Sequence, residues 1–97
     1  MNLLNELIED GEDFSEIYNE LGLCYFSFGD IKNAVKNLEC AVKEKEYDIG
    51  YLCNLGIAYY SDGKIKNAKE CIDKAYSISP DDEITKQCKT WADSITE

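Results

Sequence analysis

Apolar side chains recur every three or four residues along most of the chain, which is the spacing of one face of an α-helix. The pattern predicts helices over about residues 14–28, 31–45, 47–61, 65–78 and 82–95. In the first helix the expected buried face consists of Ile17, Leu21, Cys24, Tyr25 and Phe28. No stretch alternates apolar and polar residues as a strand would. The sequence therefore predicts an all-α protein.

Turn residues mark the ends of these helices. Gly29 and Gly63 each follow a predicted helix, at a position where the positive φ angle that glycine tolerates ends the helix. Asp30 then stands where a carboxylate caps the next helix. Pro80 ends the fourth helix, because the residue before a proline avoids the α conformation.

The chain contains an internal repeat, in which residues 49–82 are a second copy of residues 15–48. When the two copies are aligned without gaps, 11 pairs are identical, whereas unrelated segments would share roughly two or three. In the first copy the identical residues are Leu21, Gly22, Tyr25, Ser27, Gly29, Ile31, Lys32, Asn33, Ala34, Ala41 and Asp48. Each copy holds two predicted helices, so the repeated unit is a helix-turn-helix.

Small residues recur at equivalent positions of the two copies. Two antiparallel helices approach closely only where the side chains at their crossing are small. We therefore expect the close crossings at Gly22, Ala34 and Ala41, and at Gly56, Ala68 and Ala75.

This pattern resembles the tetratricopeptide repeat family, whose unit follows W-x2-L-G-x2-Y, then A-x3-F, A and P. The first copy matches with Tyr18, Leu21, Gly22, Tyr25, Ala34, Leu38 and Ala41. The second copy matches with Leu52, Leu55, Gly56, Tyr59, Ala68, Ile72, Ala75 and Pro80. The chain departs from the family where Tyr18 and Leu52 replace Trp, Leu38 and Ile72 replace Phe, and Glu46 replaces the first Pro.

The resemblance implies one domain, a right-handed superhelical stack of antiparallel helix pairs with about six helices. The first repeat would span residues 15–48, the second would span residues 49–82, and a C-terminal capping helix would span residues 83–97. Residues 2–14 would form an N-terminal helix and linker, because the repeat alignment, extended towards the N-terminus, pairs Leu4 with Leu38 and Leu7 with Ala41.

Members of this family are scaffolds in which the first helix of each unit lines a concave groove. The resemblance thus implies a scaffold or adaptor that binds a peptide or helical segment of another protein. Its groove residues would be Asn19, Leu23, Phe26, Cys53, Asn54, Ile57, Tyr60, Gln87 and Trp91. Two alternatives stay open. The aromatic residues of this set can instead pack against neighbouring helices, and the chain can instead be a stacking or self-association module of a larger assembly that uses its terminal helices.

The groove lacks the charges of one well-known subclass. Members that hold the acidic tails of heat-shock chaperones use Lys, Arg and Asn at five positions. The residues at these positions here are Asn19, Leu23, Asn54, Ile84 and Cys88. Only Asn54 agrees, and no cation is left to pair with carboxylates. We therefore expect no binding of chaperone tails, and we expect Asn54 to form a hydrogen bond between helices.

The amino-acid composition argues against several further classes of function. The net charge of −10, from 20 acidic and 10 basic residues, argues against nucleic-acid or anionic-membrane partners. No apolar run approaches the roughly 18 residues of a transmembrane helix. The chain has no His and five cysteines without a C-x-x-C pair, so we expect no enzyme activity, cofactor, metal site or disulfide framework. Reduced cysteines predict a cytoplasmic protein, with Cys24 and Cys71 buried.

Overall fold

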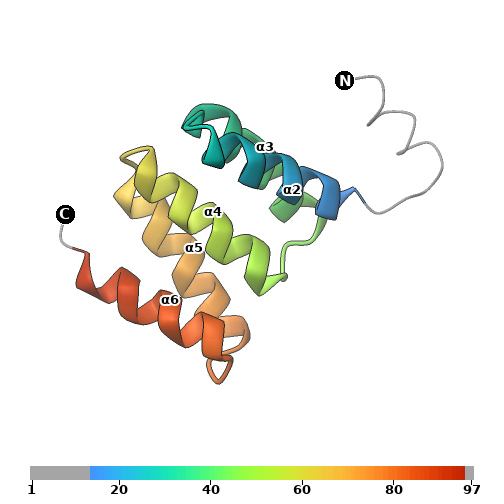
Figure 1. Ribbon diagram of the computed structural model, residues 1–97. Coiled ribbons are helices and arrows are strands. Elements are labelled where there is room, and N and C mark those ends of the chain that lie inside the picture. Colours follow the sequence, from blue (N-terminus) through green and yellow to red (C-terminus); the bar gives the residue numbers. More distant parts are fainter. Residues whose placement is uncertain (1–13, 96–97) are drawn as a thin grey trace.

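The computed structural model describes residues 14–95, which form five helices and no strand. The helices are α2 (Ser15–Ser27), α3 (Ile31–Glu44), α4 (Ile49–Ser61), α5 (Ile65–Ile78) and α6 (Glu83–Ser94). Consecutive helices pack against each other from α2 to α6 (Figure 1). The predicted all-α stack of antiparallel helix pairs is confirmed. The sixth expected helix, within residues 2–14, lies outside the described residues.

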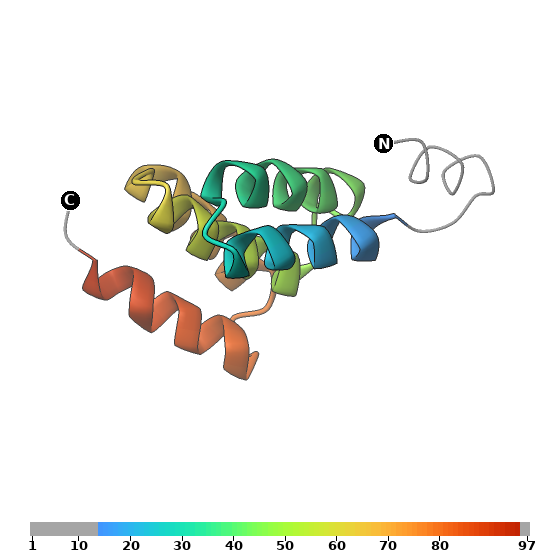
Figure 2. The ribbon, with the colours of Figure 1, turned by 45° about the horizontal axis from the view of Figure 1, so that its top comes forward.

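The first helices of successive units form one layer of the molecule. Besides its neighbours in the chain, α4 contacts both α2 and α6. Figure 2 shows the same succession of helices from a second direction, with α6 at one end of the stack. The predicted groove would therefore lie on the surface of α2, α4 and α6.

Both helix pairs turn in the same way. Gly29 has a φ angle of 83°, and its equivalent Gly63 has one of 80°. After α2, the backbone N–H of Asp30 donates to the carbonyl oxygen of Tyr25 at 2.9 Å. Together with the bond from the Gly29 N–H, this is the Schellman motif that satisfies the last carbonyls of a helix. The same two bonds close the turn at Gly63, so the prediction that these glycines end helices is confirmed.

Aspartates cap three of the five helices. Asp30, Asp48 and Asp82 accept hydrogen bonds from backbone N–H groups three residues ahead, at 3.3, 3.0 and 3.1 Å. The cap predicted at Asp30 is confirmed. At the start of α5 the equivalent residue is Lys64, which forms no such side-chain bond.

The helices of each unit cross closely at the predicted small residues. A Cβ atom added to Gly22 would lie 2.6 Å from Cγ of Leu38, and one added to Gly56 would lie 2.8 Å from Cδ1 of Ile72. The four alanines at these crossings are completely buried: Ala34, Ala41, Ala68 and Ala75. The crossing assignment is therefore confirmed.

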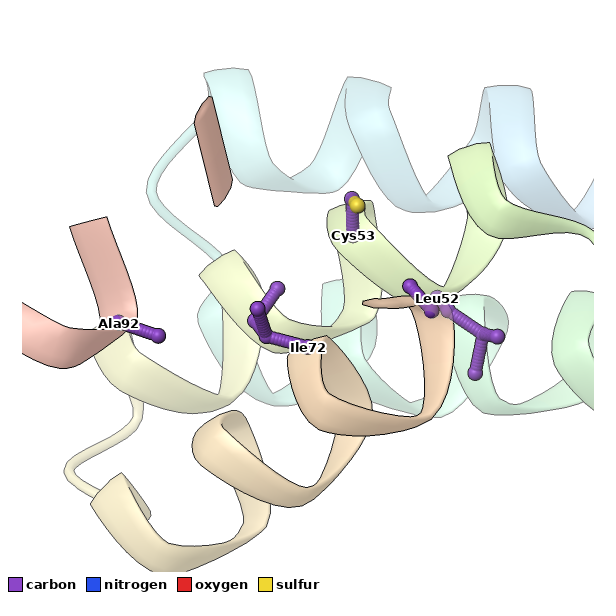
Figure 3. Packing of buried hydrophobic residues seen from close by; sticks show 5 residues of the cluster. Leu52, Cys53, Ile72 and Ala92 are labelled. Atoms are coloured by element: carbon purple, nitrogen blue, oxygen red, sulfur yellow. The ribbon is translucent and has the colours of Figure 1, made fainter. Parts of the chain in front are cut away.

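Helix α4 is buried on two sides. Leu55 and Ala58 pack against Val35 and Leu38 of α3. Figure 3 shows the second cluster, in which Leu52 and Cys53 of α4 meet Ile72 of α5 and Ala92 of α6. The apolar positions of α4 thus hold the two helix pairs and α6 together.

The buried face predicted for α2 is partly wrong. Cys24 is exposed, and Phe28, one residue beyond the helix, is 85% exposed. The buried residues of α2 are instead Ser15, Asn19 and Gly22. The physical reason is that the part of the chain described by the structure has no helix before α2 to cover the side that α3 covers on α4.

Cys71 is closer to the predicted burial than Cys24 is. Its side chain is half-buried between the helices. Burial, and then the nearby Glu70 carboxylate, raise the pKa of its thiol to about 11. The thiol of Cys71 therefore stays protonated at neutral pH, as expected for a packing residue.

An ion pair joins the two helix pairs at the turn after α4. Lys32 Nζ lies 2.9 Å from Asp62 Oδ1. The hydrogen bond from Lys32 lowers the pKa of Asp62 below its usual value. A carboxyl group with a lowered pKa in the folded state adds stability above its unfolded pKa, and this stability is lost as the pH falls through the folded pKa.

We expect Lys32→Gln to raise the pKa of Asp62, which NMR titration of the carboxyl carbon would measure. The stabilities of variant and wild type should then differ at neutral pH and converge in acid. Lys66→Gln is the matched control, because Lys66 is the equivalent residue of the second unit. An unchanged pKa of Asp62 in Lys32→Gln would contradict this assignment.

Candidate functional site

A pocket of about 370 Å³ opens between α4 and α6. Its lining residues are Ile57, Tyr60, Gln87, Cys88 and Trp91. One-turn spacings place these side chains together, since positions three or four apart share a helix face. None of the five side chains is charged, so the pocket suits an apolar group.

Two aromatic rings form one wall of this pocket. The rings of Tyr60 and Trp91 meet edge to face, with centroids 5.3 Å apart and an angle of 78° between their planes. Tyr60 keeps 42% of its surface exposed, and Ile57 keeps 39%. Trp91 also packs against the core cluster of α4, α5 and α6. The wall is thus anchored in the core and open to solvent on its outer side.

Polar side chains join α2 to α4 by hydrogen bonds. Asn54 Nδ2 donates a hydrogen bond to Asn19 Oδ1 at 3.0 Å. One helical turn away, the hydroxyl oxygens of Ser15 and Tyr51 are 3.3 Å apart. The hydrogen bond between helices that the sequence predicted for Asn54 is confirmed. Asn19, only 9% exposed, is occupied by this bond.

The remaining predicted groove residues differ in accessibility. Leu23 is exposed on α2, while Phe26 is half-buried against the cluster of α3 and α4. Cys53 is 3% exposed and belongs to the core. Burial, followed by the hydrogen bond with Cys88, raises the pKa of the Cys53 thiol to about 12. Cys53 therefore supports the lining residue Cys88 and presents almost no surface of its own.

A second hollow, which the sequence analysis did not predict, lies between α2 and α3. Its volume is about 270 Å³. The lining residues are Tyr18, Leu21, Tyr25, Asn33, Lys36, Asn37 and Cys40. The internal repeat could have pointed to it, because the equivalents of all these residues except Leu21 line a hollow against α3 in the second unit.

The family model of the tetratricopeptide repeat matches residues 15–48 and 49–82, the two copies of the helix-turn-helix. The chain belongs to the tetratricopeptide repeat family. A comparison with curated proteins found no significant match. Tetratricopeptide repeats are typically non-catalytic modules that present extended concave surfaces to other proteins.

Residues 14–95 of this tetratricopeptide repeat chain contain neither a candidate membrane-spanning helix nor a candidate metal-binding cluster. Over residues 14–95, no helix combines the length and the apolar character needed to cross a membrane. Within the same range, Cys, Asp and Glu side chains form no group of three that could hold a metal ion.

Proposed function

We propose that this tetratricopeptide repeat chain binds an apolar or helical segment of a partner protein on the surface of α2, α4 and α6. One apolar side chain of the segment enters the pocket between α4 and α6. The observation that carries the proposal is the uncharged pocket in which Ile57 and Tyr60 are open to solvent beside Trp91. Well-packed aromatic pockets of this kind are where binding energy concentrates in protein interfaces.

The charge of the chain favours a partner with basic residues beside its apolar anchor. The predicted groove residues include no Lys or Arg, and the whole chain has a net charge of −10. A net negative charge of the chain mainly speeds the encounter with a basic partner. We therefore expect salt to change the association rate more than the dissociation rate.

A second candidate function is stacking or self-association through the ends of the array. The observation that favours it is the hollow on α2 and α3, where Tyr18, Leu21 and Tyr25 are only half-buried. A helix from another chain could pack there. The experiments below separate this function from binding at the pocket.

The proposal is tested by capturing partners from the source cells on the purified full chain, with mass spectrometry as the readout. Affinities are then measured by calorimetry with each partner identified. We expect Tyr60→Ala to weaken binding by about 1–2 kcal/mol, and Phe26→Ala/Tyr60→Ala to weaken it further. Truncation of Tyr60 removes a partly exposed ring, so circular dichroism should still show a folded helical protein.

Tyr76→Ala is the matched control for this experiment. Tyr76 lies on α5 and is exposed to nearly the same degree as Tyr60, but it is not part of the pocket. The control should bind like the wild type. Wild-type affinity of the folded Phe26→Ala/Tyr60→Ala variant would overturn binding at the pocket and favour the ends of the array.

A further inference from the structure

Cysteines of two neighbouring helices meet where α6 rests on α4. Cys88 of α6 lines the pocket and is half-buried, whereas Cys53 of α4 is 3% exposed. Cys88 packs against the core cluster that contains Cys53, and a hydrogen bond joins the two thiols. One sulfur of the pair is therefore accessible from the pocket, and the other is its buried neighbour.

Small side chains on α6 allow it to approach α4 closely at this point. Ala92 lies one turn after Cys88, is 3% exposed, and belongs to the same core cluster as Cys53. Figure 3 shows Ala92 and Cys53 in this cluster. A disulfide needs β-carbons about 3.5–4.5 Å apart, a separation that large side chains between two helices would prevent. The packing of α6 on α4 therefore suits a bond between the sulfurs of Cys53 and Cys88.

The other three cysteines have different surroundings. Cys24 is exposed on α2, and Cys40 lines the hollow between α2 and α3. Cys71 of α5 packs against the cluster of α3 and α4. All five thiols are free in the structure, and disulfides in reducing compartments are usually transient and regulatory. Cys53 and Cys88 are thus the pair that the fold places for a reversible bond.

We propose that hydrogen peroxide oxidises Cys53 and Cys88 to a disulfide that fastens α6 to α4. The Cys88 thiolate first attacks the peroxide, so that an S–O bond forms, the O–O bond breaks, and the leaving hydroxide takes up a proton to become water. The Cys53 sulfur then attacks the sulfenic acid on Cys88. The S–S bond forms, the S–O bond breaks, and a second water leaves with the thiol proton of Cys53. Two thiols thus lose two electrons to one peroxide, and a dithiol reductant reverses the bond by exchange.

Accessibility sets the order of these two steps. Cys88 faces a pocket of about 370 Å³, which admits a small oxidant. Burial, followed by the hydrogen bond with Cys88, raises the pKa of the Cys53 thiol to about 12, so Cys53 stays protonated and is not the thiol that attacks first. A sulfenic acid on Cys88 then has a neighbouring thiol with which to condense.

The bond holds a helix at the end of the stack. Among the described helices α6 contacts α4 and α5, and Figure 2 shows it at one end of the array. Elements with few buried contacts open more easily than the core. Both walls of the pocket lie one turn from the bond, since Ile57 follows Cys53 by four residues and Trp91 follows Cys88 by three. The disulfide therefore fixes the two walls relative to each other, and its formation does not depend on the proposed binding of a partner.

The test treats the purified full chain with hydrogen peroxide at micromolar protein concentration. Remaining thiols are blocked with iodoacetamide, and the peptides are mapped by mass spectrometry without reduction. We expect an intramolecular link between Cys53 and Cys88 that dithiothreitol removes. The link should raise the unfolding temperature by about 10 °C or more, because a closed loop between residues 53 and 88 restricts the unfolded chain.

Cys88→Ser and Cys71→Ser are the matched variants, because both replace a half-buried cysteine. Cys71→Ser should keep the link and the rise in unfolding temperature, whereas Cys88→Ser should lose both. Circular dichroism checks that each variant is folded, and the peptide map of the wild type needs no variant. If peroxide leaves Cys53 of the wild type a free thiol, or links it to Cys71 or to a second chain, the proposal is overturned. An equal rise in unfolding temperature in Cys88→Ser would also overturn it. These measurements use no partner, so their outcome is separate from that of the binding experiment.

Discussion

Replacement of Gly56 by Leu should lower the free energy of unfolding by about 1–3 kcal/mol or more, because a close helix crossing cannot absorb added methylenes. A Cβ atom at this position would lie 2.8 Å from Cδ1 of Ile72 and 3.3 Å from the carbonyl oxygen of Ala68. Ile72 is fully buried, so its side chain has no free space into which to move. Denaturant unfolding followed by circular dichroism measures the loss.

The equivalent crossing in the first unit should respond in the same way. A Cβ atom at Gly22 would lie 2.6 Å from Leu38 Cγ, and Leu38 is also fully buried. Gly22→Leu is therefore expected to be at least as destabilising. Unchanged unfolding midpoints for both leucine variants would contradict the packing described for the two helix pairs.

Gly50→Ala and Gly56→Ala form a matched pair within α4. At Gly56, inside α4, alanine gains about 0.5–1 kcal/mol of helix propensity, which the clash with Ile72 opposes. Near a Cβ at Gly50 the closest atom is Oδ1 of Asp48 at 3.2 Å, the oxygen that caps α4, so the cap has to yield by a few tenths of an ångström. Gly50→Ala should thus be nearly neutral, whereas Gly56→Ala should be destabilising.

Ile72→Val tests the contact itself, because it removes the Cδ1 atom nearest to Gly56. Alone, this change should cost about 0.5–1.5 kcal/mol. In the Gly56→Ala background it should cost less, since it also relieves the clash. A double-mutant cycle with no coupling would show that the loss in Gly56→Ala has another origin.

These crossings could be predicted from the sequence because small residues stand at equivalent positions of the two repeats. Gly22 and Gly56 occupy the same place in the repeated unit, and a Cβ atom at either position would clash with the partner helix. The same reasoning fails for Cys24. The spacing of apolar residues shows which side of a helix is apolar. Whether that side is buried depends on a neighbouring helix, which the periodicity within α2 does not specify.

The pocket could be predicted in outline but not in depth. The family pattern puts Ile57 and Tyr60 on the first helix of a unit, and their three-residue spacing brings them to one face. The burial of Cys53 depends on how α6 rests on α4 and α5, with Ala92 beside it. That angle between helices is set by packing in three dimensions, and no local spacing encodes it.

Replacement of Asn54 by Leu should lower the free energy of unfolding by about 1–3 kcal/mol, because it leaves the amide of Asn19 buried without its partner. Asn19→Leu should be destabilising for the same reason. Leucine closely matches asparagine in shape, so the loss reflects the missing hydrogen bond of 3.0 Å rather than a cavity. The measurement is again denaturant unfolding.

The variant Asn19→Leu/Asn54→Leu decides what the asparagine pair does. Two apolar side chains in contact leave no unsatisfied amide, so the double variant should be more stable than the sum of the two single losses implies. Such coupling in the absence of any partner assigns the pair to the contact between α2 and α4. If the losses of stability in the two single variants were additive in the double variant, the asparagine pair would not stabilise the contact between α2 and α4. If a captured partner then bound Asn54→Leu much more weakly than the wild type, Asn54 would instead be a contact residue of the groove.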